Sequence, residues 1–336
     1  MGSSSWTFMV PVGELLLMEA VAREFRIDRV TLVHRDKLPR VRKRLGLGAT
    51  ISEVKKTIPG WDFFDAGLAY AVMKQRGEPE EVQHQCLAVI REELSILALS
   101  QLGYSRRRQM SPIALAGENT HPYITFLAYN DRDRTRFGKM FMMTTPSNQV
   151  VLDGRWKAFQ DGVFFTKLLR ILQGKTKVED SWRCELRRAA VLIGESVGAN
   201  DLLKSFVWNW VALEMLLTRQ QDKVRETLPK RAEALLGWAT YWEPDDYEGR
   251  IRDVYMKRNG LLHRGRREAI SPEDLAFTDH LLVNLLANLV SYPKLFRSKD
   301  DVIKFSARVE AERTLGITSK VRPKGLRFIR SFRPEF

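Results

Sequence analysis

The sequence predicts an α+β protein, in which a mixed front half is followed by a back half made of helices. Short apolar and β-branched runs at 6–12, 29–34 and 67–73 indicate strands, and an amphipathic pattern over 78–102 indicates a helix. Beyond residue 148, helical patterns follow one another with scarcely any strand pattern between them. We therefore expect a mixed α/β sensing or targeting domain at 1–150, a helical bundle at 151–298, and a C-terminal helix and basic tail at 299–336.

In the front half, the helix over 78–102 has Pro79 and acidic residues in its first turn, which suits a helix start. The stretch 104–119 contains Pro112, Gly117 and a cluster of arginines at 106–108, and we expect an irregular connection there.

Six helices are expected in the back half, each with a capping or breaking residue near an end. They span 156–172, 181–197, 201–217, 229–240, 244–258 and 272–291. Asp180 or Ser181, Asn200 and Ser271 are the expected N-caps, Pro229, Pro244 and Pro272 suit first turns, and Gly198 suits the end of the second helix.

The charge balance favours a polyanionic partner. The chain has 55 Lys and Arg against 41 Asp and Glu, a net charge of +14, so nucleic acid is the first candidate and an anionic membrane surface the second. Its two cysteines support neither a disulfide framework nor a zinc site. The first residues lack the pattern of a signal peptide, and no apolar run is long enough to cross a membrane. We expect a cytoplasmic protein without a metal or other cofactor.

The segment 257–267 holds the most informative chemistry, because it carries five basic side chains, one histidine and no acid. Arginine is a permanently charged phosphate ligand, and histidine exchanges protons near neutral pH. RNA supplies its own nucleophile, the 2′-hydroxyl, so cleavage needs only help with that proton and charge stabilisation at phosphorus. His263 suits the first task and Arg258 the second.

Spacing sets a condition on this pair. Five residues on an ideal helix place Arg258 and His263 roughly 140° apart, so they do not share a face. Loosening of the helix at Gly260, or a two-fold dimer that contributes a second pair, would let the groups converge. The alternative is that Arg258, Asn259 and His263 only cap and solvate a helix end.

A second feature favours the functional interpretation. Phe206, Trp210, Leu213 and Leu217 form an apolar stripe on one helix, and Glu214 falls inside it. An acid in such a place requires a cationic partner, and Arg258 or another arginine of the basic helix is the natural one.

Together, Phe206-x3-Trp210-x-Ala212-Leu213-Glu214-x-Leu216 and Arg258-Asn259-x3-His263 resemble the Apea-like HEPN family over residues 155–295. The resemblance implies a helical bundle that dimerises with both motifs in one cleft. Such domains are often metal-independent endoribonucleases of prokaryotic anti-phage defence, abortive infection or toxin systems. It implies catalytic roles for Arg258 and His263, support from Asn259 and Glu214, and RNA as substrate, tRNA among the candidates. An antitoxin or a phage-derived trigger would act as a further partner.

We add Lys257, Arg264, Arg266 and Arg267 as RNA-binding residues, because they extend the positive segment around the motif. A non-catalytic RNA-binding or regulatory module is the alternative function. The basic tail at 320–336 is expected to be a solvated arm, or else to dock through Phe328, Ile329 and Phe332 so that its arginines hold phosphates. Four histidines are expected to be structural: His34, His84, His121 and His280.

Overall fold

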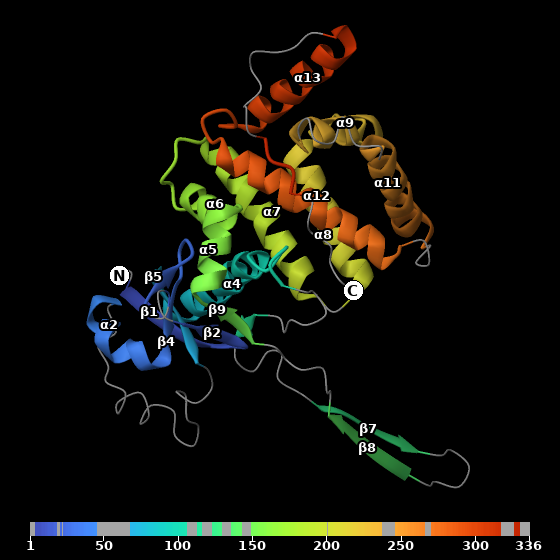
Figure 1. Ribbon diagram of the computed structural model, residues 1–336. Coiled ribbons are helices and arrows are strands. Elements are labelled where there is room, and N and C mark those ends of the chain that lie inside the picture. Colours follow the sequence, from blue (N-terminus) through green and yellow to red (C-terminus); the bar gives the residue numbers. More distant parts are fainter. Residues whose placement is uncertain are drawn as a thin grey trace.

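A sheet layer lies beneath a stack of helices in the computed structural model (Figure 1). The structure describes residues 4–18, 21, 23–45, 68–105, 113–115, 123–129, 136–142, 149–199, 201–236, 246–265, 270–316 and 326–329. The α+β class predicted from the sequence is confirmed for these residues.

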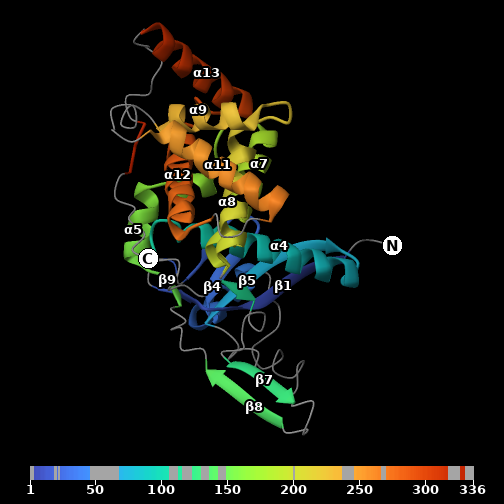
Figure 2. The same cartoon turned by 90° about the vertical axis from the view of Figure 1, so that its right-hand side faces the viewer.

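The front half is built on an antiparallel five-stranded sheet with the order β3-β4-β5-β1-β6. A short parallel pair, β2 and β9, joins the start of the chain to the entry of the helical half, and β7 and β8 form a separate hairpin (Figure 2). The strands are β1 Ser4–Gly13, β2 Leu15–Leu17, β3 Phe25–Arg26, β4 Thr31–His34, β5 Ala69–Gly77, β6 Ala114–Leu115, β7 Tyr123–Tyr129, β8 Arg136–Met142 and β9 Val150–Leu152.

The helices of the front half are η1 Arg35–Lys37, a 3₁₀ turn, α2 Leu38–Leu45 and α4 Pro79–Leu99. The back half holds α5 Gly154–Gly162, α6 Phe165–Leu172, α7 Asp180–Gly198, α8 Leu202–Leu217, α9 Val224–Leu236, α11 Tyr247–Arg264, α12 Pro272–Ser291 and α13 Lys299–Leu315. The predicted C-terminal helix is therefore present as α13.

The predicted helix over 156–172 is wrong, because the chain forms two helices there. Val163 and Phe164 leave the helical conformation, and Asp161 accepts a hydrogen bond from the Thr166 hydroxyl across the break. Phe164 is thereby buried between the two helices, so core packing overrides helix propensity at this point.

Some helix starts also differ from the predicted ones. Glu179, not Asp180 or Ser181, is the N-cap of α7, and Asp201, not Asn200, is that of α8, where its side chain accepts from Lys204 N. Pro229 lies inside α9, because the helix begins upstream at Val224. The prediction for α12 is confirmed in full, since Ser271 and Asp274 form a reciprocal capping box around Pro272.

The front and back halves meet where α4 packs on α7. Gly194 of α7 lies so close to α4 that a Cβ built there would stand 1.7 Å from the carbonyl oxygen of Ser95. One continuous cluster of buried apolar side chains runs from Val12 to Val309 across this contact. The boundary near residue 150 stays a prediction, and the core continues across it.

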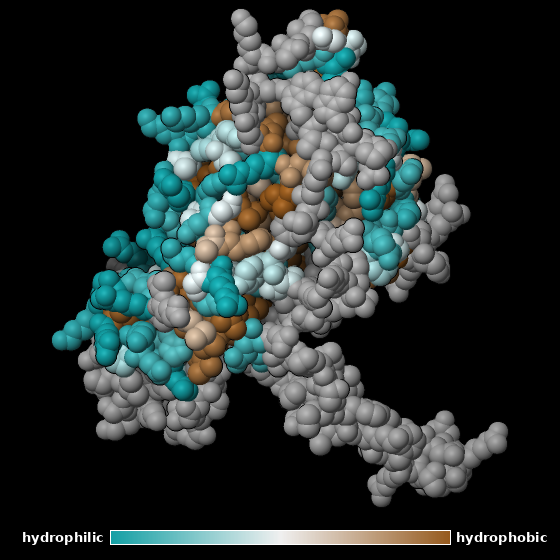
Figure 3. All heavy atoms as spheres, viewed as in Figure 1, coloured by the Kyte–Doolittle hydropathy of each residue, from teal (hydrophilic) through white to brown (hydrophobic). Residues whose placement is uncertain are grey.

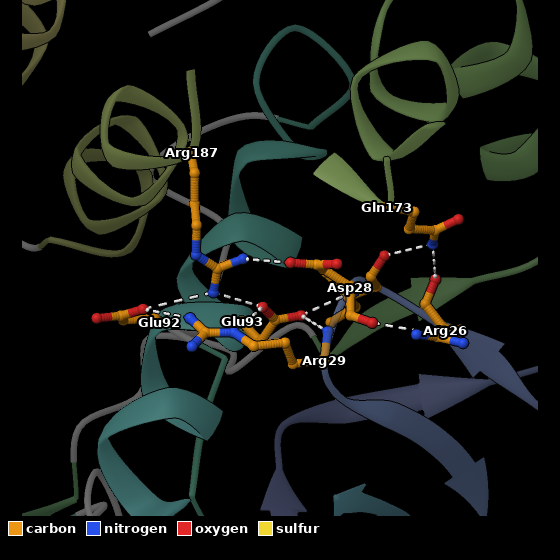
Figure 4. Close-up of polar contacts among 8 residues, drawn as sticks. Arg26, Asp28, Arg29, Glu92, Glu93, Gln173 and Arg187 are labelled. Carbon is orange, nitrogen blue, oxygen red and sulfur yellow. Dashed lines mark hydrogen bonds and ion pairs between the residues drawn. The ribbon is translucent and has the colours of Figure 1, made fainter. Parts of the chain in front are cut away.

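A buried ion-pair network reinforces the same contact (Figure 4). Glu93 of α4 is fully buried and accepts hydrogen bonds from the backbone N–H groups of Asp28 and Arg29, at 2.8 and 3.2 Å. Arg187 of α7 donates to Glu93 at 2.5 Å and to Asp28 at 2.9 Å. The network therefore ties α7 both to α4 and to the turn between β3 and β4.

Candidate functional site

The segment singled out in the sequence forms the C-terminal half of α11. Asp246 caps the start of this helix by accepting from Gly249 N. Gly265 ends it in the left-handed conformation, with φ 63°, a backbone geometry that glycine adopts without strain. The helix runs unbroken through Gly260, so the structure does not show the loosening at that residue that was one of two ways for the pair to converge.

Glu214 and Arg258 form the predicted ion pair between α8 and α11. The Nη2 of Arg258 lies 3.2 Å from Oε2 of Glu214, and the indole Nε1 of Trp210 donates to Oε1 at 2.9 Å. Tyr255 of α11 packs its ring on Trp210, with centroids 5.8 Å apart. The apolar stripe of α8 is fully buried, as expected from the sequence. Glu214 therefore fixes the position of Arg258 against the core.

Asn259, the next residue in the chain, also helps to orient Arg258. The Nη1 of Arg258 donates to Oδ1 of Asn259 at 3.1 Å, and the supporting role of that asparagine stays a prediction. The side chain of Arg258 is only 17% exposed, and its buried Nε has no hydrogen-bond partner among the described residues. The guanidinium thus keeps one unsatisfied N–H donor.

His263 lies in the last turn of α11 and is exposed to solvent. Because the helix is continuous, its side chain leaves the axis about 140° away from that of Arg258, which faces α8. One chain therefore does not bring the two motif residues together on a single face. A phosphate held by both groups needs a second copy or a movement of the helix end.

Exposed apolar side chains accompany His263 on α11. Met256 is 47% exposed and lies two turns before His263 on nearly the same face. Leu262, directly before His263, is 48% exposed. These two apolar side chains, on the half of α11 that carries the motif, are available for contact with another molecule.

The additional basic residues have different environments. Lys257 donates from Nζ to both carboxylate oxygens of Asp274, at 2.8 and 2.9 Å, so its charge is already compensated by α12. Arg264 belongs to α11, but its side chain lies outside the described residues, as do Arg266 and Arg267.

The remaining motifs have structural surroundings. His34 caps η1 by accepting from Asp36 N, His84 is exposed on α4, and His280 contacts the C-terminal segment discussed below. His121 lies outside the described residues. Gly174, shortly after α6, has φ 68° and closes the end of that helix in the left-handed conformation.

Within the described ranges, no group of three or more His, Cys, Asp or Glu side chains is arranged to hold a metal ion. Nor does any helix in them combine the length and the apolar character needed to cross a bilayer. Comparison of this chain with known protein families, with curated proteins and with solved structures finds no match.

Proposed function

We propose that the chain is a metal-independent endoribonuclease of the HEPN type, active as a homodimer on RNA in the cytoplasm. The single observation that carries this proposal is the Arg258–Glu214 pair, which fixes the arginine of an Arg-Asn-x3-His motif on the same helix as an exposed histidine. The motif resemblance places such proteins in prokaryotic anti-phage defence or toxin systems, with a trigger or an antitoxin as partner.

In the proposed reaction, neutral His263 accepts the proton of the RNA 2′-hydroxyl as that oxygen attacks the adjacent phosphorus. The bond from phosphorus to the 5′-oxygen breaks, which leaves a 2′,3′-cyclic phosphate and, once the departing oxygen is protonated, a 5′-hydroxyl. In this proposal Arg258 stabilises the charge on the phosphoryl oxygens through its permanently charged guanidinium.

The geometry of α11 supports the proposed dimer. Since Arg258 and His263 leave an unbroken helix on different sides, the composite site takes His263 from one copy and Arg258 from the other, or pairs both motifs across a two-fold axis. The exposed Met256 and Leu262 supply apolar area for that interface. Light scattering should give twice the monomer mass, and Met256→Glu with Leu262→Glu should give the monomer mass and abolish cleavage.

Cleavage is tested by incubating the purified protein with total RNA in excess chelator and mapping the ends. We expect 2′,3′-cyclic phosphate and 5′-hydroxyl ends, with activity lost in Arg258→Ala and lowered about 10²–10⁴-fold in His263→Ala. His84→Ala is the matched control, because His84 is also exposed on a helix but lies on α4. Cleavage by His263→Ala at the wild-type rate would exclude His263 as the base.

A non-catalytic RNA-binding or regulatory module is the second candidate. It is favoured by the low exposure of Arg258, whose charge Glu214 already compensates. Under this alternative the basic residues bind phosphates, and RNA stays intact at every protein concentration. Binding without cleavage in the chelator experiment would establish it.

A further inference from the structure

The C-terminal segment Leu326–Ile329, hereafter the strap, lies along α12 in an extended conformation (Figure 1). Hydrophobic side chains gather along the middle of this side of the molecule (Figure 3). Leu326, Phe328 and Ile329 pack against the main core cluster, and Arg327 donates from Nη1 to the carbonyl of Gly162 on α5, at 3.0 Å. The expectation of a solvated arm is thus wrong for these four residues, and docking through Phe328 and Ile329 is confirmed.

Two asparagines of α12 bind the backbone of the strap, each at both a donor and an acceptor. Asn288 accepts from Arg327 N at 2.8 Å and donates to Arg327 O at 3.0 Å. Asn284 accepts from Ile329 N at 2.7 Å and donates to Ile329 O at 3.4 Å. The imidazole Nε2 of His280, one turn further, also donates to Ile329 O at 2.7 Å.

The spacing of these contacts matches two regular structures. Four residues of a helix advance about 6.0 Å, and two residues of an extended chain advance about 6.6 Å. Asn284 and Asn288 are four apart, while the strap residues they bind are two apart. Because these two lengths agree, side chains four apart on a helix can bind the backbone of an extended peptide at two alternate residues. The side chains of the peptide at those two residues take no part in these hydrogen bonds.

Phe328, between the two strap residues that the asparagines bind, makes the side-chain contacts that would select one peptide over another. The ring of Phe328 meets Tyr247 of α11 edge-on at 5.6 Å between centroids, and His280 at 5.2 Å. Tyr247 in turn contacts Phe277, which Arg250 covers at 4.2 Å. An aromatic side chain therefore has a defined place between α11 and α12.

The burial of the asparagines is the observation that separates a binding site from ordinary packing. Asn284 and Asn288 are 0% and 1% exposed on a helix whose other buried residues are mainly apolar. Burying an amide is costly unless its hydrogen bonds are satisfied. Both amides use an acceptor and a donor on the strap. Asn288 also donates to Leu235 O of α9 at 2.8 Å, and Asn284 also donates to His280 O at 3.0 Å, but the side-chain oxygens of both accept from the strap.

We propose that His280, Asn284 and Asn288 form a binding site for an extended peptide with a central aromatic residue, and that the strap of the same chain is its displaceable ligand. The site holds the peptide backbone at two alternate residues and the aromatic ring between them. The proposal is independent of catalysis. Ten positions separate Leu326 from Gly316, the residue that ends α13. A chain of that length reaches at most about 34 Å, which is enough for the strap to bind α12 of its own chain.

Hydrogen–deuterium exchange on the full chain tests the first half of the proposal. The amides of Arg327 and Ile329 should be protected in the wild type at every protein concentration, and Asn284→Ala should accelerate exchange at Ile329 by about tenfold or more. Gln149→Ala is the control, because it removes an exposed side-chain amide from the same chain. Unchanged exchange at Ile329 in a folded Asn284→Ala variant would overturn the proposal, as would protection that depends on protein concentration.

Displacement tests the second half. In the full-length Phe328→Ala variant, the strap should leave the site, and a labelled peptide with the sequence of residues 325–331, GLRFIRS, should then bind one to one. The same peptide with alanine in place of its phenylalanine should bind at least about tenfold more weakly. No binding of the wild-type peptide to the Phe328→Ala chain, or equal binding of both peptides, would overturn the proposal even if Asn284→Ala failed to fold.

Discussion

The guanidinium of Arg258 and the carboxylate of Glu214 lie 3.2 Å apart across the α8–α11 contact, with side chains only 17% and 22% exposed. Removal of Arg258 leaves Glu214 with the indole of Trp210 as its remaining side-chain donor. We expect Arg258→Ala and Glu214→Ala each to lower the free energy of unfolding by about 1–3 kcal/mol. The double variant should lose clearly less than the sum, because the partners are coupled.

Urea unfolding of the two single variants and the double variant measures this coupling. Arg252→Ala is the control on the same helix, since Arg252 pairs with Glu248 one turn away at the surface, where such pairs contribute about 0.3–0.5 kcal/mol. Strict additivity of the Arg258 and Glu214 losses would show that the pair is not an energetic unit.

The buried carboxylate of Glu93 makes Arg187 critical for stability. Arg187→Ala removes the main cation from a fully buried acid, and we expect a loss of about 3–5 kcal/mol in the free energy of unfolding. Arg188→Ala, at the exposed neighbouring position, should change it by less than about 0.5 kcal/mol. If both variants unfolded at the same urea concentration, the network in Figure 4 would have no energetic importance.

His280 gives the fold a pH dependence. Burial lowers its pKa from the ordinary value, the hydrogen bond to Ile329 O opposes this shift, and the charge of Arg250 adds to it. The unfolded chain therefore binds the proton more readily than the folded one. Stability should fall as the pH drops below about 6.5, and the loss should level off below the lowered pKa of the folded state.

The measurement is the urea midpoint at neutral pH and at about pH 5.5, in the wild type and in His280→Gln. The variant should show a smaller decrease between the two conditions. His84→Gln is the control, because His84 is exposed and should leave the difference unchanged. A decrease in His280→Gln equal to that of the wild type would assign the pH dependence to other groups.

Arg264, Arg266 and Arg267 should set RNA affinity and leave the chemical step alone, because none of them titrates near neutral pH. Charge reversal at these positions should weaken binding. Each arginine–phosphate interaction that is removed should reduce the slope of log affinity against log salt by about 0.7 for a single strand. The single-turnover rate at saturating protein should change little. A triple variant that binds normally but no longer cleaves would identify one of these arginines, not Arg258, as the transition-state partner.

The sequence predicts a structural feature correctly where the residues that determine the feature are close together along the chain. The Ser271-Pro272 start of α12 and the acid within the apolar stripe of α8 were both interpreted correctly, because a cap needs three residues and a stripe needs only helical periodicity. The helix break at Val163 was missed, since only the packing of Phe164 into the core reveals it.

Long-range pairing could not be predicted in the same way. The parallel strands β2 and β9 have three residues each and are joined by more than a hundred residues of chain. Docking of the strap through Phe328 and Ile329 was an alternative that the sequence offered, but its partners Asn284 and Asn288 could not be predicted, because they lie about 40 residues away along the chain. A signal was present, however: His280, Asn284 and Asn288 repeat every four residues, and every residue between them is apolar.

The contact between Gly194 of α7 and Ser95 of α4 limits how the front half can move relative to the helical half. The two helix backbones touch there without an intervening side chain. A hinge rotation of the sheet and α4 as one rigid body would therefore have to separate α4 from α7. Small sliding movements along the helix axes keep the contact intact. A displacement of the sheet relative to α7 is therefore expected to be a small shear of α7 against α4.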